Sequence, residues 1–214
     1  MITGILSSIY SGKSLLRSLM NQGLVGYSVK GQVIDIGGGV NPSYFKFIHK
    51  DPETTITTLD LNPDSVGVKI DLETDPLPYP AGRVDGVLMF NILEHIFNHS
   101  FVVREAYRVL RPGGELLGFV PFLINYHPDP SDYFRYTNEA LVKIFKLAGF
   151  SKIEIKTVGR GPFAVNYNNL MFFFPRFIRV ILLPIYWCLD WLFILVRPKV
   201  RERYPLGYIF WLKK

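Results

Sequence analysis

The sequence contains a single cysteine, Cys188, among its 214 residues. One thiol excludes a disulfide framework and a cysteine metal cluster, and it favours a reducing compartment. The first residues lack the positive charge that opens a secretory signal, and Lys13 interrupts the apolar stretch, so no cleaved leader is expected. Apolar positions between Ile5 and Leu19 instead predict an amphipathic helix that covers the sheet edge or touches a membrane.

Acidic residues are scarce near the end of the chain. Residues 1–142 carry 11 Lys and Arg against 15 Asp and Glu, whereas residues 143–214 carry 13 against 3. The composition is 49% hydrophobic and 15% aromatic, with a mean hydropathy of +0.19. Because the basic section is also apolar, it favours contact with an anionic lipid surface over nucleic acid.

The most apolar part of the segment 159–203 is residues 171–198, MFFFPRFIRVILLPIYWCLDWLFILVRP. Its longest uncharged run, Val180–Leu189, falls short of the roughly 20 residues that a spanning helix needs. Since strands of one sheet are expected on both sides, a single crossing is excluded and an interfacial or re-entrant element is predicted. A dimer interface or an active-site lid is the alternative. The predicted interface anchors are Tyr186, Trp187, Trp191, Arg176, Arg179, Arg197, Lys199, Arg201 and Arg203.

The stretch Val33–Pro42, VIDIGGGVNP, joins a β-branched run to three glycines and an Asn-Pro pair. The run predicts a buried strand over 33–36, and the glycines allow a sharp turn close to a ligand. Asn41 and Pro42 indicate a helix over 43–50, whose N-terminus favours an anionic group. The loop therefore suits a nucleotide-like ligand with both an anionic and a cationic group.

Strands and helices alternate along the rest of the chain. Helical periodicity marks 93–110, which Pro112 and the following glycines end, and Thr137 caps a helix that stops at Gly149. Such alternation predicts an α/β fold whose ligand lies at the carboxyl ends of the strands. Further strands are predicted over residues 54–61, 66–70, 84–90, 115–122, 152–158 and 204–214.

In this order and spacing, the motifs VIDIGGGVNP, TTLDLNP, KIDLETDPLPYPAGRVDGVLMFNILEHI and VLRPGGELLGFVPF resemble those of class I S-adenosylmethionine-dependent methyltransferases. The resemblance covers residues 30–158 and the last strand, and it implies a Rossmann-like, seven-stranded, mostly parallel sheet. The family often joins its last two strands by a short connection, whereas an apolar helical insertion is expected between them here. We therefore predict a single domain: an N-terminal helical segment 1–29, a cofactor-binding core 30–158, the membrane-interacting insertion 159–203 and the last strand 204–214.

The resemblance implies S-adenosyl-L-methionine as the cofactor. The glycine loop would hold its amino-acid end, Asp60 its ribose and Asp71 its adenine, while Asn91 would face donor and acceptor. Asn41 stands where the family usually has a third glycine. A dinucleotide fingerprint would instead need glycine at Pro42, where proline blocks close packing. The predicted cofactor residues are Asp35, Gly37, Gly38, Gly39, Asp60, Leu61, Asp71, Leu72, Asn91 and His95.

Acceptor chemistry is assigned to the loop HPDPSDYFRYT, 127–137. His127 is the candidate general base, with Asp132 and Arg135 beside it, although these residues could equally serve only to order the loop. This loop resembles those of bacterial methyltransferases linked to surface-glycan assembly. The predicted substrate residues are Tyr126, Asp129, Tyr133 and Tyr136.

The sequence argues against a nucleic-acid methylation site and against a metal site. No Asn-Pro-Pro-Tyr signature follows the fourth strand, which argues against nucleic-acid amino methylation. His95 and His99 could share a metal, but no third ligand is evident in the sequence, so no metal is predicted.

The predicted function is O-methylation of a sugar or lipid-linked acceptor by a cytoplasmic protein that is peripheral on the inner face of the cell membrane. Alternatives are a quinone or lipid methyltransferase and a non-catalytic, cofactor-binding membrane scaffold. A homodimer is left open.

Overall fold

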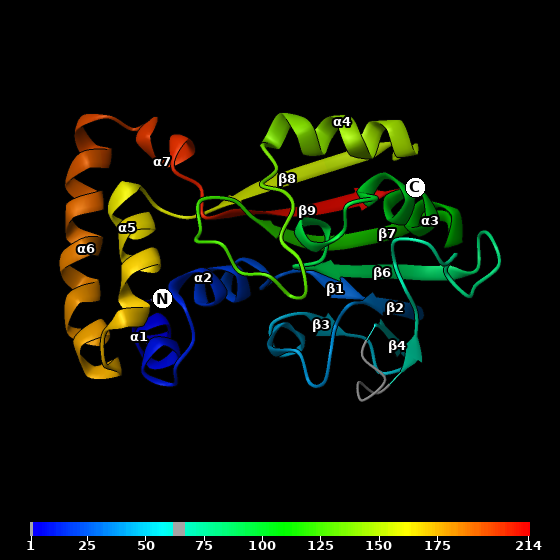
Figure 1. The fold of residues 1–214 in the computed structure, drawn as a ribbon, viewed down its shortest axis with the longest axis horizontal. Helices are drawn as coiled ribbons and strands as arrows, with labels where there is room; N and C mark the ends of the chain where they lie inside the picture. Colours follow the sequence, from blue (N-terminus) through cyan, green and yellow to red (C-terminus); the bar gives the residue numbers. More distant parts are fainter. Residues whose placement is uncertain (1, 62–66) are drawn as a thin grey trace. The chain divides into compact units, whose positions relative to one another are not determined.

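The computed structural model describes residues 2–61 and 67–214 (Figure 1). Contacts group the chain into two compact units. The first comprises residues up to 23 together with 121–126 and 157–208, and the second comprises 24–120, 127–156 and 209–214. The N-terminal helices thus group with the insertion expected over 159–203, and not with the core expected over 30–158.

The main sheet has seven strands in the order β5-β4-β2-β6-β7-β9-β8. The pairs β2–β4, β2–β6, β4–β5 and β6–β7 are parallel. β9 runs antiparallel to β7, because Gly113 N donates to Lys214 O at one end and Phe122 N donates to Leu206 O at the other. The strands are β2 (Gln32–Ile36), β4 (Thr55–Asp60), β5 (Val68–Lys69), β6 (Val84–Phe90), β7 (Leu110–Pro121), β8 (Lys152–Val158) and β9 (Gly207–Lys213).

This sheet confirms the predicted fold class, including the apolar helical insertion between the last two strands. The central strands formed where apolar runs predicted them, since Val33, Ile34 and Leu88 are completely buried in β2 and β6. The strand expected over 66–70 appears as β5, while Val66 lies outside the described residues.

The prediction of a helix over 43–50 is wrong. The chain there forms only the 3-10 turn η1 (Ser43–Lys46) and then the short strand β3 (His49–Lys50), which pairs with β1 (Ser28–Val29). Pro42 takes the cap position without a side-chain hydrogen bond, and His49 N donates to Tyr27 O. Because that strand pairing competes with helix, the glycine loop is not followed by a helical dipole.

Residues 93–110 are also less regular than predicted. They form the 3-10 turn η2 (Leu93–His95) and then α3 (His99–Val109), because Ile96 between them is extended. β7 begins directly at Leu110 and runs through Pro112, where a breaker was expected, with an irregular register opposite β6. In contrast, α4 (Asn138–Ala148) has the predicted caps: Thr137 accepts from Ala140 N, and Gly149 adopts φ 109°.

The helices of the first unit are α1 (Ile2–Tyr10), α2 (Leu15–Gly23), α5 (Pro162–Leu170), α6 (Arg176–Val196) and α7 (Val200–Arg203), with the 3-10 turn η3 (Met171–Phe173). α5 and α6 form a hairpin and lie side by side, and α1 packs against α6 (Figure 1). Tyr167 OH donates to Arg179 O across the hairpin at 2.7 Å, and Leu16 N donates to Asn168 Oδ1 at 2.9 Å.

α6 corrects the expectation that no apolar stretch is long enough to span a membrane. Among the described residues, this helix of 21 residues is the one that meets the length and composition for a crossing. The uncharged run considered in the sequence, Val180–Leu189, ends where Asp190 follows. The structure buries this carboxylate against α5, where it accepts from Phe163 N and Ala164 N, so the apolar helix continues beyond it.

Candidate cofactor and acceptor site

The glycine loop after β2 is shaped by close packing. Gly37 adopts φ 69°, and a Cβ added there would lie 1.8 Å from Ile92 Cδ1. A Cβ at Gly38 would lie 1.9 Å from Asp35 Oδ2. Larger residues at these two positions would therefore displace the loop, which explains why this segment of the sequence requires glycine.

Asp35 lies beneath this loop and is completely buried. Both of its carboxylate oxygens accept from Tyr44 OH, at 2.7 and 2.6 Å. Burial raises the pKa of Asp35 to about 7, opposed by the Tyr44 hydrogen bond and assisted by the nearby charge of Asp60. The predicted cofactor residue is thus placed as a support of the loop, and it does not line the cavity above.

A cavity of about 600 Å³ opens at the carboxyl ends of β2, β4 and β6. This volume falls within the range of roughly 300–1,000 Å³ that is usual for small-molecule sites. Gly38 and Gly39 are not among its walls, but Gly39 N donates to Asp60 Oδ2 at 3.1 Å and so ties the loop to the wall. The predicted cofactor residues that line it are Gly37, Asp60, Leu61, Asp71, Leu72, Asn91 and His95.

Asn91 provides the strongest sign that this cavity takes a ligand. It adopts φ 56°, which is uncommon for a residue with a side chain, at the carboxyl end of β6. Its amide donates to Glu94 Oε1, whereas its buried Oδ1 has no partner within the described structure. A buried acceptor without a partner is costly, so a bound molecule with an N–H or O–H donor would satisfy it.

Beside the cavity, η2 and the 127–137 loop bring Glu94, His95 and His127 together. Glu94 is completely buried, and its Oε1 lies 3.7 Å from His95 Nε2 and 3.8 Å from His127 Nε2. The two imidazole rings meet edge to face with centroids 5.1 Å apart. His95 Nδ1 lies 2.5 Å from Ser131 O, and because a carbonyl oxygen only accepts, that nitrogen carries a proton.

His127 is charged more readily than an ordinary histidine. The Glu94 carboxylate raises the pKa of His127, with a further contribution from Asp132, while partial burial and Arg135 lower it. Asp132 accepts from His127 N at 2.9 Å and from Arg135 Nη2 at 2.6 Å. The Arg135 pairing holds the pKa of Asp132 far below its usual range. Asp132 and Arg135 thus position the His127 backbone and ring.

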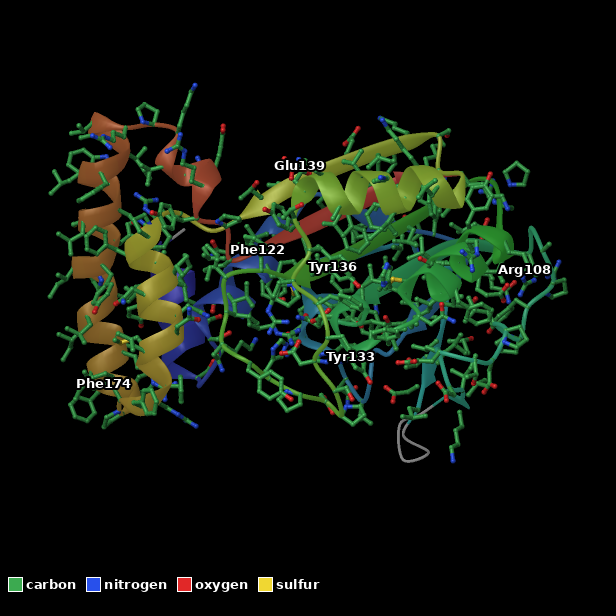
Figure 2. The ribbon with its side chains drawn as sticks, turned by 45° about the horizontal axis from the view of Figure 1, so that its top comes forward. Arg108, Phe122, Tyr133, Tyr136, Glu139 and Phe174 are labelled. Atoms are coloured by element: carbon green, nitrogen blue, oxygen red, sulfur yellow. The ribbon has the colours of Figure 1, made fainter. Side chains whose placement is uncertain are left out.

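The predicted substrate residues divide into two groups. Asp129 and Tyr133 line the cavity. Tyr136 is buried and its hydroxyl donates to Leu93 O at 2.9 Å, so it holds the loop against η2. Figure 2 labels Tyr133 and Tyr136. Tyr126 belongs to the first unit and is exposed.

Sequence reasoning did not include Glu94 in the site. The spacing of the residues could have indicated it, because Glu94 stands three residues after Asn91 at the end of an apolar strand and directly before His95. The structure shows that these two side chains bond to each other.

A metal could also be held here, contrary to the reasoning that no third ligand exists. Ligand atoms of Glu94, His95 and His127 lie within 4.8 Å of one another. One carboxylate and two imidazoles form a common zinc ligand set. His99, which sequence analysis paired with His95, is not part of this group. The prediction of no metal stays a prediction.

Comparison with known proteins bears on the same residues. Residues 34–118 match the family described as "Methyltransferase domain". This segment contains the glycine loop, Asp60, Asp71 and the Asn91–His95 turn. This part of the chain is therefore similar to a methyltransferase domain. The match indicates S-adenosylmethionine as its cofactor.

Individual relatives agree with this assignment. The chain is 29% identical over 150 residues to the rice chloroplast 2-methyl-6-phytyl-1,4-hydroquinone methyltransferase 2, covering 62% of this chain and 42% of the relative. It is 29% identical to a ubiquinone/menaquinone biosynthesis C-methyltransferase of Methylobacterium nodulans, covering 40% of each protein. The chain therefore spans about two fifths of the length of these curated relatives.

Solved structures share the fold. A SAM-dependent methyltransferase from Archaeoglobus fulgidus superposes with a TM-score of 0.56 at 16% identity, covering 97% of both chains. At this identity the similarity establishes the α/β architecture and the seven-stranded, mostly parallel sheet.

Proposed function

We propose that this protein transfers a methyl group from S-adenosylmethionine to a hydroxyl-bearing acceptor. The observation that supports it is the cavity at the carboxyl ends of β2, β4 and β6, which combines the predicted cofactor residues with the unpartnered Asn91 Oδ1. The Glu94–His95–His127 cluster adjoins the same cavity through His95. Cofactor walls and a proton-accepting group therefore lie at one strand edge.

Different residues of the cavity wall can contact different parts of the cofactor. The Asp60 carboxylate can accept from ribose hydroxyls, and the segment Asp71–Leu72 offers a polar and an apolar contact to a base. Asn91 Oδ1 can accept from the cofactor's amino group. When bound, the sulfonium supplies an already activated methyl group, so the protein's main contribution is orientation.

The proton of the acceptor is assigned to His127. In this assignment neutral His127 accepts the proton of an acceptor O–H, while the bound cofactor would give its methyl group to that oxygen and leave as a neutral thioether. The Glu94 carboxylate, 3.8 Å from His127 Nε2, stabilises the imidazolium that results. His95 lines the cavity directly and is the competing base, so the two histidines must be tested separately.

The first acceptor class is a sugar or lipid-linked hydroxyl at the cytoplasmic membrane surface, which rests on the resemblance of the loop 127–137 to those of methyltransferases linked to surface-glycan assembly. A second class, a hydroquinone ring, is favoured by the names of two relatives: the rice name specifies a hydroquinone, and the Methylobacterium name specifies ubiquinone/menaquinone biosynthesis. The same base serves both, because removing a phenol proton also makes the neighbouring ring carbon nucleophilic. After that carbon takes up the methyl group, its ring hydrogen would leave as a proton and the oxygen would regain one, which restores the aromatic hydroquinone.

Incubation with methyl-labelled donor tests this proposal, using a membrane lipid extract and a synthetic prenyl-hydroquinone as separate acceptors. Both reactions add one methyl group, and proton NMR separates an O-methyl from a ring C-methyl product. His127→Asn should reduce turnover on the order of a hundredfold, and His95→Asn less than tenfold. The opposite ranking would assign the base to His95. Tight donor binding with no turnover on either acceptor would favour the cofactor-binding scaffold.

A further inference from the structure

The exposed side of α6 is apolar along its whole length. Exposed Phe177, Ile181, Ile185, Leu192 and Leu195 recur at helical spacing on the side that faces away from α5. A helix of 21 residues is about 31 Å long. The adjoining turn adds exposed Phe172, Phe173 and Phe174, the last of which is labelled in Figure 2. An apolar patch of this extent is typical of an interaction surface.

The charged residues within α6 are either buried or lie at its N-terminal end. Asp190 is completely buried and accepts from Phe163 N at 3.0 Å and Ala164 N at 2.8 Å, which caps the N-terminus of α5. Arg179 donates to Phe174 O and Phe172 O at the opposite end. Between Arg179 and Arg197, the exposed residues of α6 therefore carry no charge.

A second feature lies at the C-terminal end of α6. A cavity of about 700 Å³ is lined by the cations Arg197, Lys199 and Arg203 together with Phe193, Val200 and Tyr204. Residues 159–204 carry seven Lys and Arg against two Asp and Glu, of which Asp190 is the buried cap. Guanidinium and ammonium groups above apolar walls suit a phosphate headgroup whose acyl chain continues along the helix.

We propose that this surface of the first unit, α6 with its cationic pocket, binds the interface of an anionic phospholipid bilayer. Charge complementarity selects this occupant over a second copy, which would bring the same cations into a low-dielectric contact. Trp191 is half exposed beside the apolar stripe, where an indole ring suits the headgroup level.

The connections of α6 favour an interfacial position over a crossing. α5 and α6 lie between β8 and β9, which are neighbours in one sheet, so the chain must leave and return on the same side. α5 has only nine residues, about 14 Å, which cannot return the chain across a bilayer. α6 therefore lies in the plane of the interface.

Co-sedimentation with lipid vesicles tests the proposal. The full chain is mixed with vesicles of phosphatidylcholine alone or with phosphatidylglycerol added, at low and high salt. We expect strong binding only with phosphatidylglycerol, weakened by salt. Arg197→Gln/Lys199→Gln/Arg203→Gln should lower partitioning onto anionic vesicles about a hundredfold, and Ile181→Asn/Ile185→Asn at least tenfold.

A matched control lies on α4, where Lys143, Lys146 and Leu147 are also exposed. Lys143→Gln/Lys146→Gln/Leu147→Asn should bind vesicles within twofold of the parent. Equal binding to both vesicle types, an equal loss in this control, or resistance to carbonate extraction would overturn the proposal. So would a dimer in sedimentation velocity that the Ile181 and Ile185 substitutions dissociate. Because no residue of this surface lines the cofactor cavity, failure here leaves the proposed methyl transfer standing.

Discussion

Replacing Asp35 by Asn should stabilise the protein near neutral pH and leave its stability unchanged in acid. The pKa of Asp35 rises from 3.8 to about 7 on folding. Below pH 4 the carboxyl is protonated in both the folded and the unfolded chain, so wild type and variant should be alike. As pH rises from 4 towards 7, the unfolded chain loses this proton first, and wild type loses stability relative to Asp35→Asn.

The structure sets an upper limit on this difference. A pKa displaced from 3.8 to about 7 corresponds to about 4 kcal/mol when the carboxylate is fully ionised. The asparagine oxygen can still accept from Tyr44 OH, so the hydrogen bond survives the change. Tyr44→Phe provides the matched control. It removes the interaction that lowers the Asp35 pKa, and the pH-dependent loss should then extend to higher pH.

Urea unfolding of wild type and variant between pH 4 and pH 8 measures the difference directly. Taking the difference between two proteins at each pH cancels the contributions of other titrating groups. A difference that stays constant across this range would refute the argument that Asp35 is buried in its protonated form.

Three further predictions concern the rest of the molecule. Glu94→Gln should lower the pKa of His127, because the Glu94 carboxylate raises it. The rising limb of kcat/KM against pH should then move to lower pH. An unchanged limb would show that Glu94 does not act on the catalytic base. Asp190→Ala should lower the free energy of unfolding by about 3 kcal/mol in urea titrations, since two buried amides of α5 lose their acceptor, and a loss under 0.5 kcal/mol would contradict the capping role. Chelation with EDTA should leave methyl transfer unchanged because the methyl group is already activated, whereas a fivefold loss restored by zinc would assign a metal to the Glu94 cluster.

Sequence patterns predicted the elements that are decided locally or by deep burial. The apolar runs of β2 and β6 form central strands, and the caps at Thr137 and Gly149 bound α4 as expected. The same patterns failed at residues 43–50, where pairing with β1 outweighs a helix-start signal that has no side-chain hydrogen bond. Strand pairing between distant segments is not encoded in a local window.

The candidate site could be predicted from the sequence only where its residues follow strands that local patterns locate. Asp60, Asp71 and Asn91 lie at strand ends, which parallel topology brings to one edge. The burial of Asp35 against Tyr44 depends on the turn η1, and the approach of Glu94 to His127 depends on how the 127–137 loop folds back, so both required the structure. Asp190 shows the converse, because a charge that appeared to interrupt an apolar run is turned inward to cap α5.

The central claim is that the cavity at the strand ends holds S-adenosylmethionine. Calorimetric titration with S-adenosylhomocysteine, comparing wild type with Asp60→Ala, tests it most directly. We predict binding of one molecule per chain by wild type and at least a tenfold increase in Kd for the variant, because Asp60 lines the cavity and ties the glycine loop through Gly39 N. No binding by folded wild type, or equal Kd values for the two proteins, would contradict the assignment.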